Sequence, residues 1–250
     1  MSRLKIETNQ KLLVNASTLL LLQNAIILVL IGISFVLRQS TLLLSLIQII
    51  TFGLDILGIA LLGAGLYMLS KIIPSPVGSL FTKKSGSLLL FWVPLTLIWR
   101  LSGRFFSSQI TQSLSTAASM LWVFFLASLV LTVAVFNLNK MIGRFREQGV
   151  ILEGGGALCT TYAVLNVIGV FMLTLGLIGA APFLEQFAQV DPNNPPTSFE
   201  FAQGAIFFVL LSSVGQFIKG LIVPILGLLV FSQLRGVFRE MEFPSENSSQ

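Results

Sequence analysis

Two oppositely charged side chains, Asp55 and Lys219, lie inside long apolar runs of this sequence. A charge at the centre of a bilayer costs about 2.5–3.5 kcal/mol on insertion scales, so such residues are rare unless they have a partner or a task. Each lies 16 residues before a basic residue near the end of its run, Lys71 or Arg235. At 1.5 Å per residue, both charges are therefore predicted at the same depth, about 24 Å from those basic residues.

Three interpretations of Asp55 and Lys219 are open. The pair can form a buried salt bridge that fixes which helices meet. It can form a gate or an ion- or proton-coupled site, because ionisable residues inside a membrane are functional candidates. The two side chains can also stay apart, neutral or extended toward the interface. The first two interpretations place the candidate pair, Asp55 and Lys219, inside a helix bundle.

Other polar residues are predicted to face the interior with this pair. Side-chain amides inside a membrane usually bond a neighbouring helix, and contact with a substrate is the alternative. The candidate cavity-lining residues are Asn24, Gln48, Thr51, Asn166 and Gln216. The glycines of the same apolar runs are predicted to allow close packing of helices rather than hinge motion.

The composition indicates a chain whose main solvent is lipid. Hydrophobic residues make up 54% of its 250 residues and charged residues 10%, against about 25% charged residues in soluble domains. The chain has no histidine, which excludes histidine-ligated haem, most catalytic zinc sites and Ser-His triads. Its one cysteine, Cys159, allows no disulfide within the chain. We expect no cofactor, no metal, no nucleic-acid partner and no enzymatic activity.

Six apolar runs are long enough, or nearly so, to cross a bilayer as helices, which takes about 20 residues. They are residues 14–37, 41–70, 85–99, 116–139, 157–182 and 203–233. The third is the weakest, because it is short and contains Pro94. The predicted fold is an all-α polytopic membrane bundle of six transmembrane helices, with the first run retained rather than cleaved as a signal peptide.

The basic residues predict the orientation of these runs. With the N-terminus inside, eleven Lys and Arg residues fall in inner segments and three in outer ones, which is a strong positive-inside bias. Omitting the third run would move a basic cluster and the tail outside, so six spans are favoured. Both termini are therefore predicted in the cytoplasm, with the bilayer and the anionic headgroups of its inner face as partners.

A repeated pattern divides the chain into three predicted helical hairpins, 1–77, 78–149 and 150–240, within a single transmembrane domain. An aromatic residue precedes a cation by four positions at 67–71, 136–140 and 231–235. Placing Tyr67 on Phe231 also places Gly63 on Gly227 and Asp55 on Lys219. Common ancestry and chance similarity both explain so few matches. Residues 241–250 are predicted to be a disordered cytoplasmic tail.

Three connecting features complete the prediction. The basic stretches that end at Glu147 and Glu242 share a Phe-Arg-Glu motif and are predicted to be short helices that extend into the inner interface or lie along it. A kink is predicted before Pro224, which lacks an N–H. The segment 183–202 carries acidic residues and no Lys or Arg, which suits either a solvated connector or a vestibule that concentrates cations.

Two functions from different classes fit these features. The first is a small-solute or ion permease, or an accessory subunit of one, supported by the charged pair and the acidic segment. The alternative is a non-transporting membrane scaffold or assembly factor that binds other membrane proteins, supported by the short loops and glycine-rich faces. A membrane enzyme is a distant third. A water-accessible polar cavity would favour the permease, and dry packing of the polar residues would favour the scaffold.

Overall fold

The computed structural model describes residues 3–33, 41–73, 76–107, 114–150, 156–188 and 199–241, and all regular structure in these ranges is helical. Its elements are α1 (Arg3–Ile33), α2 (Thr41–Leu69), α3 (Pro76–Ser107), α4 (Leu114–Glu147), α5 (Gly156–Ala188), α6 (Phe199–Phe217), η2 (Ile218–Ile222) and α7 (Val223–Glu240). The π-turn η2 joins α6 and α7 without a break. An apolar chain in lipid must pair its backbone groups internally, and helices do so within one segment.

Five helical stretches are long and apolar enough to cross a bilayer. They are Ile6–Ile33, Ser45–Leu69, Leu121–Glu147, Ala157–Phe183 and Ala205–Glu240. The short third run of the sequence lies within α3, which is not among these five. Such helices fit an integral membrane location and indicate a multi-pass membrane protein.

Several helices extend beyond the apolar runs from which they were predicted. α1 begins at Arg3 rather than near residue 14, because polar residues outside the hydrocarbon continue the same helix. α5 passes through Pro182 and ends at Ala188, since one proline removes a single N–H donor from a helix that has many. As predicted, α4 and α7 continue through their basic stretches, to Glu147 and Glu240 respectively.

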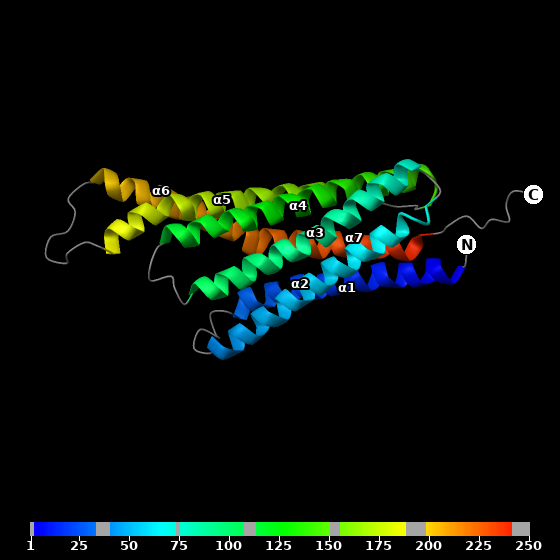
Figure 1. The fold of residues 1–250 in the computed structure, drawn as a ribbon, viewed down its shortest axis with the longest axis horizontal. Helices are drawn as coiled ribbons and strands as arrows, with labels where there is room; N and C mark the ends of the chain where they lie inside the picture. The colour runs from blue at the N-terminus through cyan, green and yellow to red at the C-terminus, as the bar shows by residue number, and fades with distance from the viewer. Residues whose placement is uncertain are drawn as a thin grey trace, which may run out of the picture.

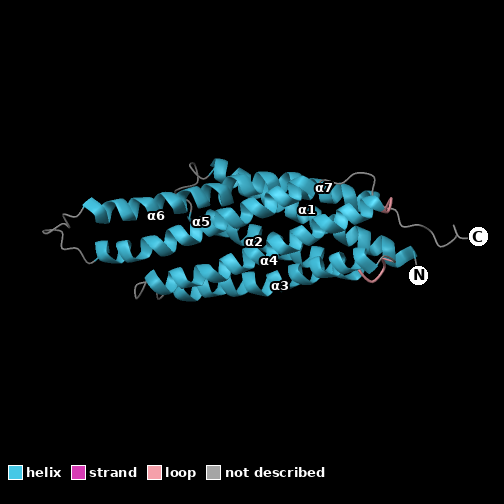
Figure 2. Cartoon of the chain, turned by 90° about the horizontal axis from the view of Figure 1, so that it is seen from above, coloured by secondary structure: helices cyan, strands magenta, loops and turns pink. Residues whose placement is uncertain are grey.

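The helices form a closed ring. From α1 to α6 each helix packs against the next in chain order, and α7, which continues α6 through η2, packs against α5 and α1 (Figures 1 and 2). α1 begins and α7 ends at the same end of the bundle, which we call the terminal end, and the opposite end is the loop end. At the terminal end, the Gln10 side-chain amide donates a 2.9 Å hydrogen bond to the Arg239 carbonyl. The two described ends of the chain therefore lie on the same side.

The core occupies the half of the bundle nearest the terminal end. The largest fully buried side chains are Leu13, Leu20, Leu62, Leu66, Leu69, Leu89, Leu138, Met141, Phe145, Leu234 and Phe238. Toward the loop end the apolar side chains are exposed, with Val29 of α1 at 57% and Leu210 of α6 at 60%. The largest buried side chains therefore belong to one half of the ring, whereas α5 and α6 stay closely packed toward the loop end.

Toward the loop end the two sides of the ring separate. α6 makes its extended contacts with α5 and η2, whereas α1 packs against α2, α7 and η2. Figure 1 shows the loop ends of α1 and α2 diverging from those of α5 and α6. The π-turn η2 lies where this separation begins.

Two glycines illustrate how closely the helices approach. A Cβ atom at Gly86 of α3 would lie 2.7 Å from the Gly63 carbonyl oxygen of α2. A Cβ atom at Gly215 of α6 would lie 2.3 Å from the Leu173 nitrogen of α5. Only glycine allows such approaches, so these contacts agree with the predicted packing role of glycines in membrane helices.

The three aromatic–cation pairs of the sequence differ in the structure. Lys71 lies over the Tyr67 ring at 5.0 Å, as the spacing predicts. Lys140 instead lies over Phe81 of α3 at 5.6 Å, and Phe231 packs in the core edge-to-face against Tyr162. The segments 151–155, 189–198 and 242–250, which include part of the acidic segment and most of the tail, lie outside the described residues.

Candidate functional site

The π-turn η2 positions Lys219. The Val223 N–H donates to the Ile218 carbonyl, five residues earlier, and Pro224 follows at the start of α7. Because proline has no N–H and its ring crowds the preceding turn, it favours a local irregularity at this point, although α3 and α5 remain α-helical through Pro94 and Pro182. Single π-turns inside helices occur frequently at functional sites. The irregularity predicted before Pro224 is therefore present, and it carries the one charged residue of this span's interior.

Lys219 begins a chain of hydrogen bonds across three segments. Its ammonium donates to the Asn166 side-chain oxygen of α5. The Asn166 amide in turn donates to the Ser128 hydroxyl of α4 at 2.8 Å. Asn166 is 1% exposed and Ser128 4%, so these two side chains are almost dry, whereas Lys219 is half-buried. The structure therefore brings together two predicted residues and adds Ser128.

An aromatic side chain flanks the ammonium. The Lys219 nitrogen lies 6.0 Å from the centroid of the Phe124 ring, which is the outer limit of a cation–π contact. Phe124 stacks on Trp99 of α3 with the ring centroids 5.3 Å apart. The Phe124 ring contributes a weak attraction and helps to hold α3 and α4 beside the network.

Asp55 lies in the same layer as this network. One central space is lined by Ile59 of α2, Leu131 of α4 and Tyr162 of α5. About one turn nearer the loop end, the same three helices carry Asp55, Ser128 and Asn166 respectively. Residues three or four apart share a helix face, so these three side chains form the next layer. We call Asp55, Ser128, Asn166 and Lys219 the polar layer.

Asp55 and Lys219 are not a salt bridge in the structure. No nitrogen–oxygen distance of 4.0 Å or less joins them, although the charge of Lys219 reaches the Asp55 carboxylate. Arg100 of α3 is the second cation whose charge reaches Asp55, and its guanidinium lies 5.0 Å over the Phe52 ring. The closest partner of the Lys219 ammonium is thus a neutral amide, and Asp55 has no hydrogen bond among the described residues.

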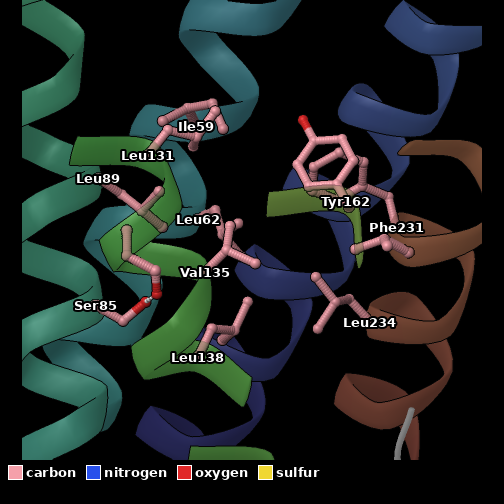
Figure 3. Close-up of a pocket in the computed structure, with 12 residues that line it drawn as sticks. Ile59, Leu62, Ser85, Leu89, Leu131, Val135, Leu138, Tyr162, Phe231 and Leu234 are labelled. Carbon is pink, nitrogen blue, oxygen red and sulfur yellow. Dashed lines mark hydrogen bonds between the residues drawn. The ribbon is translucent and has the colours of Figure 1, made fainter. Parts of the chain in front are cut away.

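The space beneath the polar layer is small and apolar (Figure 3). Its volume is about 10 Å³, roughly enough for one water molecule. It is lined by Ile59, Leu62, Ser85, Leu89, Leu131, Ala134, Val135, Leu138, Tyr162, Val230, Phe231 and Leu234. The Ser85 hydroxyl is satisfied by the Ala134 carbonyl at 2.9 Å. The Tyr162 hydroxyl points away from Leu138 and Leu234, toward the level of Ile59.

The other candidate cavity-lining residues do not border this space. Asn24 is buried, donates to the Leu20 carbonyl at 2.7 Å, and packs against Gly227 of α7 so closely that a Cβ there would lie 2.5 Å from its side-chain oxygen. Thr51 is buried and bonds its own helix, at the Ile47 and Gln48 carbonyls. Gln48 and Gln216 are exposed.

Ser128 and Tyr162 were not among the residues predicted from the sequence. Both lie in apolar helices whose inward face has no distinct pattern. Ser128 lies one turn before Thr132, whose hydroxyl donates a 3.2 Å hydrogen bond to the Ala163 carbonyl of α5. That i, i+4 spacing of hydroxyl residues was the one available signal. Cys159 is buried, and among the described residues no three carboxylate or thiol side chains gather as a metal site would require.

Comparisons with known proteins add no family to this picture. No protein-family model matches the chain, and no curated protein or solved structure matches it either. The fold and the polar layer define a class: a helical, multi-pass membrane protein with a lysine ammonium and an aspartate carboxylate that lie in one layer without forming a salt bridge.

Proposed function

We propose that this protein is a small-solute or ion permease, or an accessory subunit of one, and that its site is the polar layer. The observation that supports the proposal is the neutral partner of Lys219. An ammonium has three N–H donors, and among the described residues only the Asn166 oxygen accepts one of them. Retaining such a cation inside a membrane costs stability, and intramembrane ionisable residues of this kind mark solute and ion pathways.

The arrangement around the polar layer suits this role. The terminal half of the bundle is closed by packed side chains, and the space within its core has a volume of about 10 Å³. Lys219 and Asp55 are half-buried. We propose that a solute reaches Lys219 from the loop end and is stopped by the apolar core.

We propose six membrane crossings arranged as three hairpins, with α3 as the remaining crossing. α3 has 32 residues, which span about 48 Å at 1.5 Å per residue and exceed the hydrocarbon thickness of about 30 Å. It also runs beside α2 and α4 from the terminal end toward the loop end. A helix that connects the two ends of a membrane bundle crosses the membrane.

We place both termini in the cytoplasm. The terminal end carries exposed cations, among them Lys71, Lys83, Lys84, Lys140, Arg144, Arg146 and Arg239. Positive residues accumulate on the cytoplasmic side of membrane proteins, and each near the surface attracts anionic lipid by about 1 kcal/mol. Anionic headgroups are therefore proposed as partners of this end, and the protein is not proposed to be an enzyme.

Flux measurements in proteoliposomes test the permease proposal. Purified protein would be reconstituted, and the swelling of vesicles would be followed in alanine, propionate, ethylammonium, glucose and potassium chloride. We expect flux of at least one of them above that of protein-free vesicles. Lys219→Met should abolish it, because the substitution removes the ammonium but keeps a long apolar side chain.

The matched control is Lys84→Met, since Lys84 is exposed near the terminal end of α3. It should retain the flux of the wild-type protein. Absence of flux for every solute in well-folded wild-type protein would contradict a permease, and equal flux in the Lys219→Met variant would contradict the polar layer as its site.

A scaffold function has a separate observation in its favour. Several large apolar side chains of α6 are exposed, with Phe207 and Leu210 at 60% and Phe217 at 57%, and α5 is the helix along which α6 packs. Another membrane protein could cover this face. In that case wild-type vesicles would show no flux, and Phe207→Ala with Leu210→Ala would reduce the size of the complex extracted from native membranes.

A further inference from the structure

We propose that the polar layer binds a small zwitterion, with its carboxylate at Lys219 and its ammonium at Asp55. The inference rests on the proposed function and names the class of solute for the same site. Its basis is a pair of opposite charges that lie in one layer, do not touch each other, and each keep unused hydrogen-bonding capacity.

The cationic half of the site is the Lys219 ammonium. Asn166 accepts one of its N–H groups, and the Phe124 ring lies at 6.0 Å without accepting a conventional hydrogen bond. Two N–H donors therefore remain, and a carboxylate can accept both. Asn166 is fixed by its 2.8 Å bond to Ser128, so the ammonium is held in place before a ligand arrives. Preorganised, charge-assisted hydrogen bonds of this kind are the strong ones.

The anionic half is the Asp55 carboxylate. Asp55 receives no hydrogen bond from any described residue, and its nearest cations act on it through space, led by Lys219. Asp55 lies one turn from Ile59, and Asn166 lies one turn from Tyr162, whose side chain lines the same space as Ile59. The Tyr162 hydroxyl points toward the level of Ile59 in Figure 3. A ligand ammonium at this level could donate to the unoccupied carboxylate oxygens.

The signs of the fixed charges select the zwitterion. A simple anion at Lys219 would be repelled by Asp55, and a simple cation at Asp55 would be repelled by Lys219. Only a solute that carries both charges gains from both residues. Arg100 adds a second positive charge near Asp55, so a simple anion should still bind better than a simple cation. The expected order is zwitterion, then anion, then cation.

Binding to purified protein tests this order directly. Alanine, propionate and ethylammonium have similar size and differ in charge, and γ-aminobutyrate separates the two charges further. Each would be titrated in detergent while the thermal unfolding midpoint is followed, because a ligand that binds only the folded state raises that midpoint. We expect alanine or γ-aminobutyrate to bind about tenfold to a hundredfold more tightly than propionate, the effect of one charge-assisted hydrogen-bonding group.

Two substitutions assign the two ends of the ligand. Asp55→Asn keeps the shape and removes the negative charge, so zwitterion affinity should fall about tenfold or more while propionate affinity rises. Lys219→Met should abolish binding of zwitterion and propionate alike. Lys84→Met, remote from the layer, should leave all affinities unchanged. If a variant does not fold, the comparison of probes on the wild-type protein still decides.

The inference is overturned if propionate or ethylammonium binds wild-type protein as tightly as both zwitterions, or if none of the four binds. It is also overturned if Asp55→Asn leaves the preference for zwitterions unchanged. These results are separable from the flux experiment. Zwitterion binding without flux would support this inference and contradict the permease. Lys219-dependent flux of potassium or propionate without zwitterion binding would support the permease and contradict this inference.

Discussion

Replacing Gly215 by alanine should force α6 away from α5. A Cβ atom at this position would lie 2.3 Å from the Leu173 nitrogen and 2.7 Å from the Gly169 carbonyl oxygen. Both obstacles are backbone atoms, which no side-chain rotation can move. Ordinary Cβ contacts begin at 3.4 Å, so α6 must shift by about 1.1 Å, the difference between 3.4 and 2.3 Å.

The size of the effect follows from two opposing terms. Overpacking a tight contact costs about 1–3 kcal/mol, whereas alanine in place of a helical glycine gains about 0.5–1 kcal/mol. Gly53→Ala is the matched control, because Gly53 is also helical and nothing lies within 4 Å of its added Cβ. The helix term cancels between the two variants, so their free energies of unfolding should differ by about 1–3 kcal/mol.

The assay is reversible unfolding of the purified protein in one detergent, followed by helical circular dichroism. Gly53→Ala should be slightly more stable than the wild-type protein, and Gly215→Ala less stable than Gly53→Ala. Equal stability of the two variants would refute the close approach of α5 and α6, and with it the position of the π-turn against α5.

Three further substitutions test individual contacts by the same assay. Ser85→Ala removes the 2.9 Å hydrogen bond from α3 to an α4 carbonyl and should lower the free energy of unfolding by about 1 kcal/mol. The control Ser87→Ala, at an exposed position, should leave stability unchanged, and equal effects of the two substitutions would argue against that bond. Phe145→Ala removes a ring that is 1% exposed and should cost about 3–5 kcal/mol, so a loss below 1 kcal/mol would mean that the core there is loose. Asn166→Leu leaves the Lys219 ammonium without its acceptor and should cost at least about 1–3 kcal/mol; an unchanged stability would show that the bond is not formed.

The existence of the helices could be predicted from composition, because backbone groups in lipid have no alternative to helical pairing. The irregularity before Pro224 could be predicted for a related reason, since proline leaves a carbonyl of the preceding turn without its N–H donor and its ring crowds that turn. The residues at which the helices begin and end could not be predicted as closely. α1 begins at Arg3 and α5 continues past Pro182, because the apolar run marks the hydrocarbon and the helix extends beyond it.

The partners of the polar residues could not be predicted in the same way. In a soluble helix the apolar stripe shows which face is inward, but membrane helices are apolar all round. The depth of Asp55 and Lys219 in the membrane could therefore be predicted, but the residues of other helices that lie beside them could not. Lys219 bonds Asn166, whose other neighbour Ser128 comes from a third helix. Only the order of helices around the ring decides that contact.

The apolar core beneath the polar layer also limits how fast any solute could cross. A space of about 10 Å³ holds no continuous file of water, so ions cannot pass through the bundle as they do through an open pore. Each passage would require the packed helices of the terminal half to move apart and close again. Collective helix movements take microseconds to milliseconds. Single-molecule recordings should therefore show no discrete conductance steps, and turnover should be at most about 10³–10⁶ per second.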